Sequence, residues 1–69
     1  MNETKHDRFL RQGKTRTQRA VRAIAMVERC ANRASNDYTV DEAEKVVAEL
    51  EAAVAKARKA FEPEAEFEF

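Results

Sequence analysis

The stretch SNDYTVDE, residues 35–42, decides the fold because it separates two long amphipathic segments. Its first three residues carry short polar side chains that bond to nearby backbone groups and so compete with a continuing helix. Thr39 and Glu42 match the S/T-x-x-E capping box, in which each side chain accepts a hydrogen bond from the backbone amide of the other residue. We therefore expect a turn over residues 35–38 and a new helix from residue 39.

The segments on both sides of this turn show helical periodicity. In the first segment, the periodic apolar residues are Leu10, Ala20, Val21, Ile24, Val27, Ala31 and Ala34. In the second segment, they are Ala43, Val46, Val47, Leu50, Val54, Ala57 and Phe61. At about 100° per residue, each set falls on one face of a helix. The patterns predict helices over about residues 7–34 and 39–61, the second ended by Pro63, since the residue before a proline avoids helical geometry.

The expected architecture is an all-α, antiparallel two-helix hairpin over residues 7–61. Gly13 is its weak point, because glycine costs up to about 1 kcal/mol relative to alanine inside a helix, and we expect a kink near it. Residues 1–6 are expected to be a flexible N-terminus. Residues 62–69 form an acidic tail, which is either disordered or an extended segment whose two phenylalanines dock on a partner.

The length of 69 residues limits how stable one chain can be on its own. A chain this short buries only about 60% of the surface that its unfolded form exposes. The single cysteine, Cys30, cannot form an internal disulfide, so packing between chains is the remaining source of stability. We therefore expect the hairpin to self-associate into a helical bundle, as a homo-oligomer.

The net charge is zero, but the charge is distributed unevenly. Residues 1–35 carry nine Lys or Arg against three acidic residues, a net charge of +6, whereas residues 36–69 carry four against ten, a net charge of −6. On a helical wheel, six arginines fall within an arc of about 80° opposite the apolar face of the first helix. They are Arg8, Arg11, Arg19, Arg22, Arg29 and Arg33. Asp7 and Arg11 form the one favourable i,i+4 pair, so most of this surface is left for solvent or a second molecule.

Three interpretations of these arginines stay open. The first is a solvated helix face without any partner. The second is a protein partner with an acidic surface, which the second helix of another copy could supply, because guanidinium groups pair with carboxylates through two parallel hydrogen bonds. The third is sequence-non-specific nucleic-acid binding, since the arginines would line roughly 38 Å at 1.5 Å per residue. Against it, no aromatic residue interleaves with them to stack on bases.

The turn carries a second candidate binding site. Hydrogen-bond donors and an aromatic ring concentrate at the N-terminus of the second helix, a position suited to an anion; the residues are Asn32, Arg33, Asn36, Tyr38 and Thr39. Local capping and turn bonding explain the same residues without a ligand. The partner-binding candidates are thus Arg8, Arg11, Arg19, Arg22, Arg29, Arg33, Asn36 and Tyr38.

The sequence contains no arrangement of residues that predicts catalysis. The sequence Gly13-Lys14-Thr15 resembles the end of a phosphate-binding P-loop, but Arg8 stands where its first glycine is required. Glu3 and His6 have the Glu-x-x-His spacing of di-iron bundles, in a single copy. We therefore expect no catalytic residues, no metal site, no cofactor and no enzyme.

The N-terminus is polar where a secretory signal would be apolar, and no apolar run approaches the roughly 20 residues of a membrane span. We therefore expect a cytoplasmic protein without a membrane partner.

Four motifs follow one another along the chain: FLR (9–11), RTQRAVRAI (16–24), ANRASNDYT (31–39) and VDEAEKVVAELEAAVAKARKAF (40–61). Over residues 8–61 the chain resembles a loose family of small, mostly uncharacterised helical-hairpin proteins of bacteria, phages and mobile elements. The resemblance implies a small, non-enzymatic binding protein that occludes or sequesters a partner. If the source is a phage or mobile element, it implies an inhibitor of a host defence complex or of its nucleotide signal.

Overall fold

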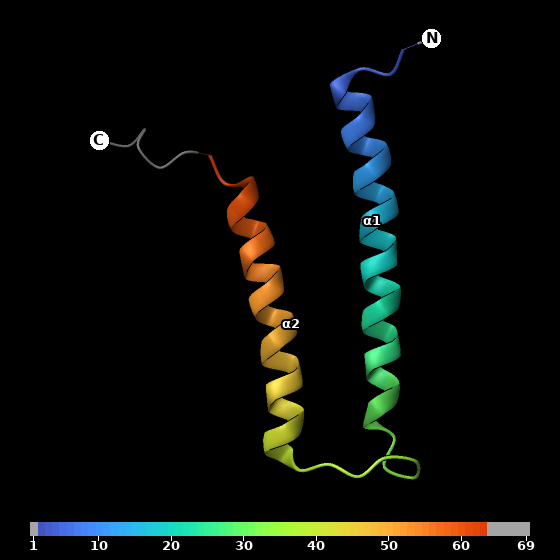
Figure 1. Cartoon of the computed structure of the whole chain (residues 1–69), viewed down its shortest axis with the longest axis vertical. Helices are drawn as coiled ribbons and strands as arrows, with labels where there is room; N and C mark the ends of the chain where they lie inside the picture. Colours follow the sequence, from blue (N-terminus) through green and yellow to red (C-terminus); the bar gives the residue numbers. More distant parts are fainter. Residues whose placement is uncertain (1, 64–69) are drawn as a thin grey trace, which may run out of the picture. The chain divides into compact units, whose positions relative to one another are not determined.

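The computed structural model describes residues 2–63, which contain two long α-helices and one short 3-10 helix. In chain order these are α1 (Lys5–Glu28), η1 (Arg29–Ala31) and α2 (Val40–Phe61), as Figure 1 shows. No strand occurs within this range, so the predicted all-α class is confirmed. The chain divides into two units, residues 1–37 and residues 38–69, the first built on α1 and η1 and the second on α2.

Helix α1 begins with a capping box that the sequence analysis overlooked. Thr4 is extended (φ −76°, ψ 167°), and its hydroxyl accepts a hydrogen bond from the Asp7 amide at 2.9 Å. The Asp7 carboxylate accepts in return from the Thr4 amide at 3.4 Å. Two amides at the helix start thus gain side-chain partners. Lys5 and His6, which the sequence analysis assigned to a flexible N-terminus, therefore lie in the first turn of α1.

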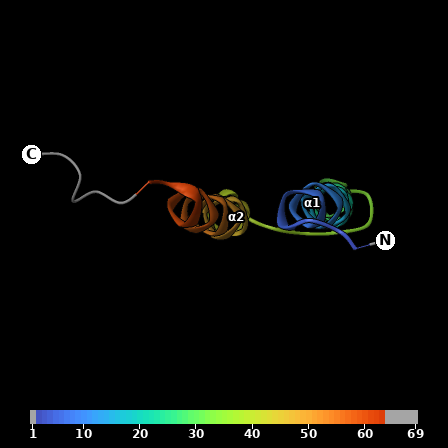
Figure 2. The ribbon, with the colours of Figure 1, turned by 90° about the horizontal axis from the view of Figure 1, so that it is seen from above.

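The kink expected near Gly13 is absent from α1. The helix is continuous from Lys5 to Glu28, and in Figure 2, where it is viewed from above, its turns superpose. Gly13 has no positive φ, and a Cβ atom built on it would lie 4.0 Å from the Phe9 Cζ, an ordinary van der Waals distance. Gly13 therefore lowers the stability of α1 without changing its path.

Helix α1 ends well before residue 34 because Asn32 offers the backbone an alternative to the helix. Asn32 is extended (φ −71°, ψ 106°), and its side-chain oxygen accepts a hydrogen bond from the Ala34 amide at 2.9 Å. Its backbone carbonyl accepts from the Asn36 amide at 3.0 Å. The prediction of a helix to residue 34 is therefore wrong, and the turn begins at Asn32 instead of Ser35.

Helix α2 has the ends that the sequence predicts. The Glu42 amide donates to the Thr39 hydroxyl at 3.0 Å, and the Thr39 amide donates to Glu42 Oε1 at 2.8 Å, so the predicted capping box is confirmed. At the other end, Glu62 is extended (ψ 144°) immediately before Pro63. Of the predicted acidic tail, Glu62 and Pro63 lie among the described residues, and residues 64–69 lie outside them.

None of residues 2–63 is buried, so neither unit has a hydrophobic core of its own. Ten large apolar side chains are exposed, from 37% for Ile24 in α1 to 75% for Val40 in α2. The others are Phe9, Leu10, Val21, Met26, Val46, Val47, Val54 and Phe61. A lone amphipathic helix can cover its apolar stripe only with another surface. No helix within residues 2–63 is long and apolar enough to span a bilayer.

Replacing Gly13 by alanine should stabilise α1 by up to about 1 kcal/mol, because the added methyl group meets ordinary contact distances and alanine is the better helix former. Far-UV circular dichroism should show higher helicity and a higher melting temperature. A matched replacement of Ala23 by glycine, inside the same helix, should change both in the opposite direction. A lower melting temperature for Gly13→Ala would contradict the ordinary contact with Phe9.

Replacing Thr39 by alanine should destabilise α2 by about 1 kcal/mol, because the Glu42 amide loses its side-chain acceptor. The measurement is amide hydrogen exchange, which should accelerate in the first turn of α2 while α1 is unchanged. Thr39→Ser retains the hydroxyl and should exchange like the parent protein. Equal exchange for the alanine and serine variants would show that the capping box does not stabilise α2.

Candidate functional site

Five arginines form one exposed line along the first unit, which we call the arginine stripe. Helical geometry extends through Arg29, whose backbone is αR (φ −66°, ψ −22°), so the wheel analysis holds for α1 and the first residue of η1. The stripe consists of Arg8, Arg11, Arg19, Arg22 and Arg29. Arg33 follows the break at Asn32, so helical spacing no longer places it on the stripe, and its part in this surface stays a prediction.

Glu3 occupies the N-terminal end of the arginine stripe. Arg11 donates to both of its carboxylate oxygens, from Nε to Oε2 at 2.8 Å and from Nη2 to Oε1 at 3.0 Å. The Nε atom of Arg8 lies 3.9 Å from Oε1 of the same carboxylate. This two-bond geometry is the strong form of an arginine–carboxylate pair. One carboxylate therefore engages two members of the stripe.

Arg11 pairs with Glu3 and not with Asp7, the partner that the sequence predicts. Asp7 takes part in the capping box with Thr4, and Arg11 turns to Glu3 instead. The hydrogen bond from Arg11 lowers the pKa of Glu3 below its ordinary value, and the Glu3 carboxylate raises the pKa of Arg11. Both shifts stabilise the charged forms.

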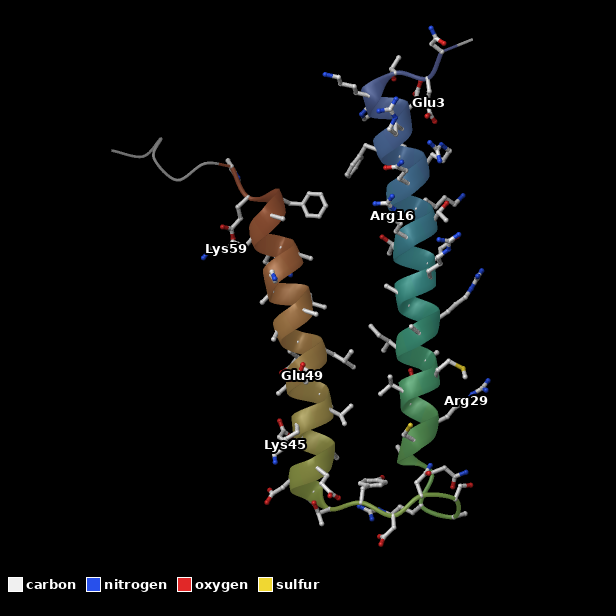
Figure 3. All side chains as sticks on the ribbon, viewed as in Figure 1. Glu3, Arg16, Arg29, Lys45, Glu49 and Lys59 are labelled. Carbon is white, nitrogen blue, oxygen red and sulfur yellow. The ribbon has the colours of Figure 1, made fainter. Side chains whose placement is uncertain are left out.

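The other end of the arginine stripe is open. Arg19, Arg22 and Arg29 are exposed and form no ion pair or side-chain hydrogen bond with any of residues 2–63. Figure 3 shows Glu3 and Arg29 at opposite ends of the first unit, with their side chains on the same side of it. The stripe thus has a half that is already bound to a carboxylate and a half that is available.

Met26 lies in the middle of the open half, and the sequence analysis did not include it among the candidates. Along the helix it lies between Arg22 and Arg29, and on the helical wheel it lies between Arg22 and Arg19, on the side opposite to the apolar stripe of α1. Its side chain is 56% exposed. The signal was present in the i, i+4, i+7 spacing of Arg22, Met26 and Arg29. The open half therefore offers apolar surface as well as positive charge.

The candidates in the turn are divided between the two units, so the anion site stays a prediction. Arg33 and Asn36 belong to the first unit, where the Asn36 amide donates to the Asn32 carbonyl. Tyr38 belongs to the second unit, where it is partly buried and precedes the Thr39 cap. The turn bonding of Asn32 and the capping by Thr39 already employ two of the polar groups that suggested an anion site.

Acidic side chains line the exposed surface of α2. Glu42 is used by the capping box, but Glu44, Glu49 and Glu51 are exposed and form no ion pair with the described part of the chain. In Figure 3, Glu49 lies on the same side of α2 as Lys45 and Lys59. Glu44 and Glu51 lie on a different flank of the helix by the wheel, next to Val47.

Metal ligands do not converge within residues 2–63, where no group of three or more His, Cys, Asp or Glu side chains could hold an ion. Glu3, half of the Glu-x-x-His spacing, is paired with Arg11. Cys30 is a free, exposed thiol.

Comparison of the chain with protein-family models, curated proteins and solved structures finds no match.

The Glu3–Arg11 contact predicts a specific pH dependence. Because the pKa of Glu3 is lowered in the folded state, its stabilisation of the N-terminal turn is complete above the ordinary glutamate pKa and is lost as pH falls through the lowered value. An NMR titration of the Glu3 side-chain carboxyl should find a pKa below the ordinary range. Arg11→Gln should return this pKa to its ordinary value, whereas Arg16→Gln should leave it unchanged. An unshifted Glu3 in the parent protein would rule out the contact in solution.

Proposed function

We propose that this chain is a non-catalytic binding protein whose arginine stripe recognises an acidic protein surface. The observation that carries the proposal is the contrast between the two halves of the stripe. Arg11 already binds a carboxylate through two hydrogen bonds, while Arg19, Arg22 and Arg29 remain open at helical spacing. The chain's own Glu3 thus exemplifies the ligand group that the open half would take from a partner.

Exposed Met26 favours a protein surface over a nucleic-acid backbone. A phosphate backbone offers charge along its whole length, but no apolar group that would cover a methionine side chain among the arginines. Protein interfaces are enriched in both methionine and arginine. Sequence-non-specific nucleic-acid binding remains the alternative function, and it is an outcome of the experiment below.

The proposal includes a scaffold in which the apolar faces of α1 and α2 pair as an antiparallel hairpin and associate with those of other copies. Its support is the exposure of these faces in each unit, since no residue of 2–63 is buried. The arginine stripe lies on the opposite side of α1, so it would stay on the outside of such a bundle. Binding there would act by covering the partner's acidic surface. Inhibition of a host defence complex, which the resemblance implies, is one use of such occlusion and stays a prediction.

The test is fluorescence anisotropy with two labelled probes. One is a helix-forming peptide whose glutamates have the spacing of Arg19, Arg22 and Arg29, with an apolar residue among them, and the other is a single- or double-stranded oligonucleotide. We expect the peptide to bind in low salt. Replacing Arg19 and Arg22 by glutamine should weaken binding by about tenfold, because two exposed ion pairs of up to about 1 kcal/mol each are lost.

The matched control replaces Lys14 and Arg16 by glutamine, which removes the same charge from outside the stripe. This variant should bind the peptide within about twofold of the parent protein, since only general electrostatic attraction is reduced. Equal weakening by both double variants would contradict recognition by the stripe. Binding of the oligonucleotide alone, with a steep loss in rising salt, would replace the proposal with the nucleic-acid alternative.

A further inference from the structure

Two exposed surfaces of this chain carry matching patterns of charge and apolar character. On the first unit, Arg22, Met26 and Arg29 follow an i, i+4, i+7 spacing. On α2, Glu44, Val47 and Glu51 follow an i, i+3, i+7 spacing. Each triplet falls within about 60° of its helical wheel at 100° per residue. The surface of the first unit therefore presents an apolar side chain between two cations, and the surface of α2 presents an apolar side chain between two anions.

The residues of both triplets are available for contact. Met26 is 56% exposed and Val47 is 46% exposed. The four charged residues are exposed and form no ion pair among the residues that the structure describes. Neither apolar side chain is covered, and none of the four charges is matched locally.

An antiparallel arrangement aligns all three positions in a single register. The two arginines are seven residues apart, as are the two glutamates, so each pair spans roughly 10 Å at 1.5 Å per residue. When the helices run in opposite directions, placing Arg22 opposite Glu51 also places Arg29 opposite Glu44. The i+4 position of the first triplet then meets the i+3 position of the second, so Met26 faces Val47. No further adjustment of register is needed.

The proposed hairpin leaves these two surfaces for different molecules. If the apolar stripe of α1 packs on the α2 of its own chain, the arginine stripe points away from that helix. Glu44 and Glu51 lie about a quarter turn from the centre of the apolar face of α2, and Val47 lies at the edge of that face nearest to them, so this flank of α2 stays accessible beside a packed α1. The two triplets of one chain therefore cannot meet within that hairpin, whereas those of two copies can.

We propose that the open half of the arginine stripe docks on α2 of a second copy of this chain, with Arg22–Glu51 and Arg29–Glu44 ion pairs around a Met26–Val47 contact. The proposal rests on the proposed function, because it names the acidic surface that the stripe recognises. The buried apolar pair supplies attraction, and the two charge pairs fix the register, since a slipped arrangement would leave the charges unmatched. A parallel arrangement would also pair the charges, but it would place Met26 opposite Ala48, so the contact with the larger Val47 favours the antiparallel direction.

Disulfide trapping tests the register directly. In full chains carrying Cys30→Ser, one protein has Met26→Cys and a second, of different mass because of a tag, has Val47→Cys. Helix axes 8–10 Å apart bring facing Cα atoms within disulfide range. Oxidation of the mixture should trap the mixed dimer efficiently. Val54→Cys lies two helical turns further along nearly the same line of α2 and is the matched control. It should yield at least about tenfold less, because Cα atoms more than 7 Å apart cannot be bridged.

Charge reversal then tests the pairing. Arg22→Glu with Arg29→Glu in the Met26→Cys protein should reduce the mixed dimer by about tenfold, because like charges face each other. Glu44→Arg with Glu51→Arg in the Val47→Cys protein should restore it when the two reversed proteins are mixed. Only contact between molecules can be restored by mixing. Circular dichroism of every variant establishes that the helices are intact before trapping.

Three results would overturn the proposal. One is equal trapping of the cysteines at positions 47 and 54. Another is failure of the two charge-reversed proteins to trap each other while both remain helical. The last is a disulfide within one chain that carries both Met26→Cys and Val47→Cys, formed at high dilution. If the acidic peptide still binds Arg19 and Arg22 in any of these cases, the second copy is the wrong partner and the proposed function stands; if the peptide also fails to bind, the proposed function fails.

Discussion

An amphipathic helix cannot cover its own apolar face, and every feature of this chain depends on that constraint. Both helices are well specified locally, with capping boxes at Thr4 and Thr39 and periodic apolar residues along one side. Yet no residue between 2 and 63 is buried. Capping and helix propensity contribute a few kcal/mol at most, whereas burial of a large apolar side chain contributes roughly 1.5–3 kcal/mol. Whatever covers these faces therefore supplies most of the stability.

The arrangement of charge follows from the same constraint. The apolar stripe of α1 and the arginine stripe lie on opposite sides of the helix, and the arginine stripe is exposed. Glu3 satisfies the N-terminal end of that stripe through Arg11, and Arg19, Arg22 and Arg29 lack any such partner among the described residues. Charge separated from apolar surface in this way suits a helix that packs on one side and recognises a partner on the other.

The sequence predicted correctly those helix ends that are set by neighbouring residues with no competing pattern. The turn chemistry, the capping box of Thr39 and Glu42, and the stop before Pro63 placed both ends of α2. The far end of α1 was predicted wrongly because the apolar spacing of Ala31 and Ala34 suggested a continuing helix, while Asn32 bonds to the Ala34 amide and ends it. The kink at Gly13 was expected from a propensity too small to interrupt a helix of 24 residues.

The sequence predicted which charged residues form the candidate site, but it predicted only part of the contacts that they make. Periodicity located the arginines, since helical spacing alone fixes which side they share. It could not reveal that Glu3 turns back to Arg11, because residues before a helix have no fixed spacing relative to it. Met26 was missed for a related reason: its residue type indicates a core, while its position indicates a surface.

The measurement that tests the account most directly is light scattering coupled to size separation, at a series of micromolar concentrations, with helicity recorded on the same samples. The account predicts a mass of two or more chains, and it predicts that helicity falls together with mass on dilution, because the apolar faces of α1 and α2 are covered only in the assembly. A fully helical monomer that unfolds cooperatively at micromolar concentration would contradict it.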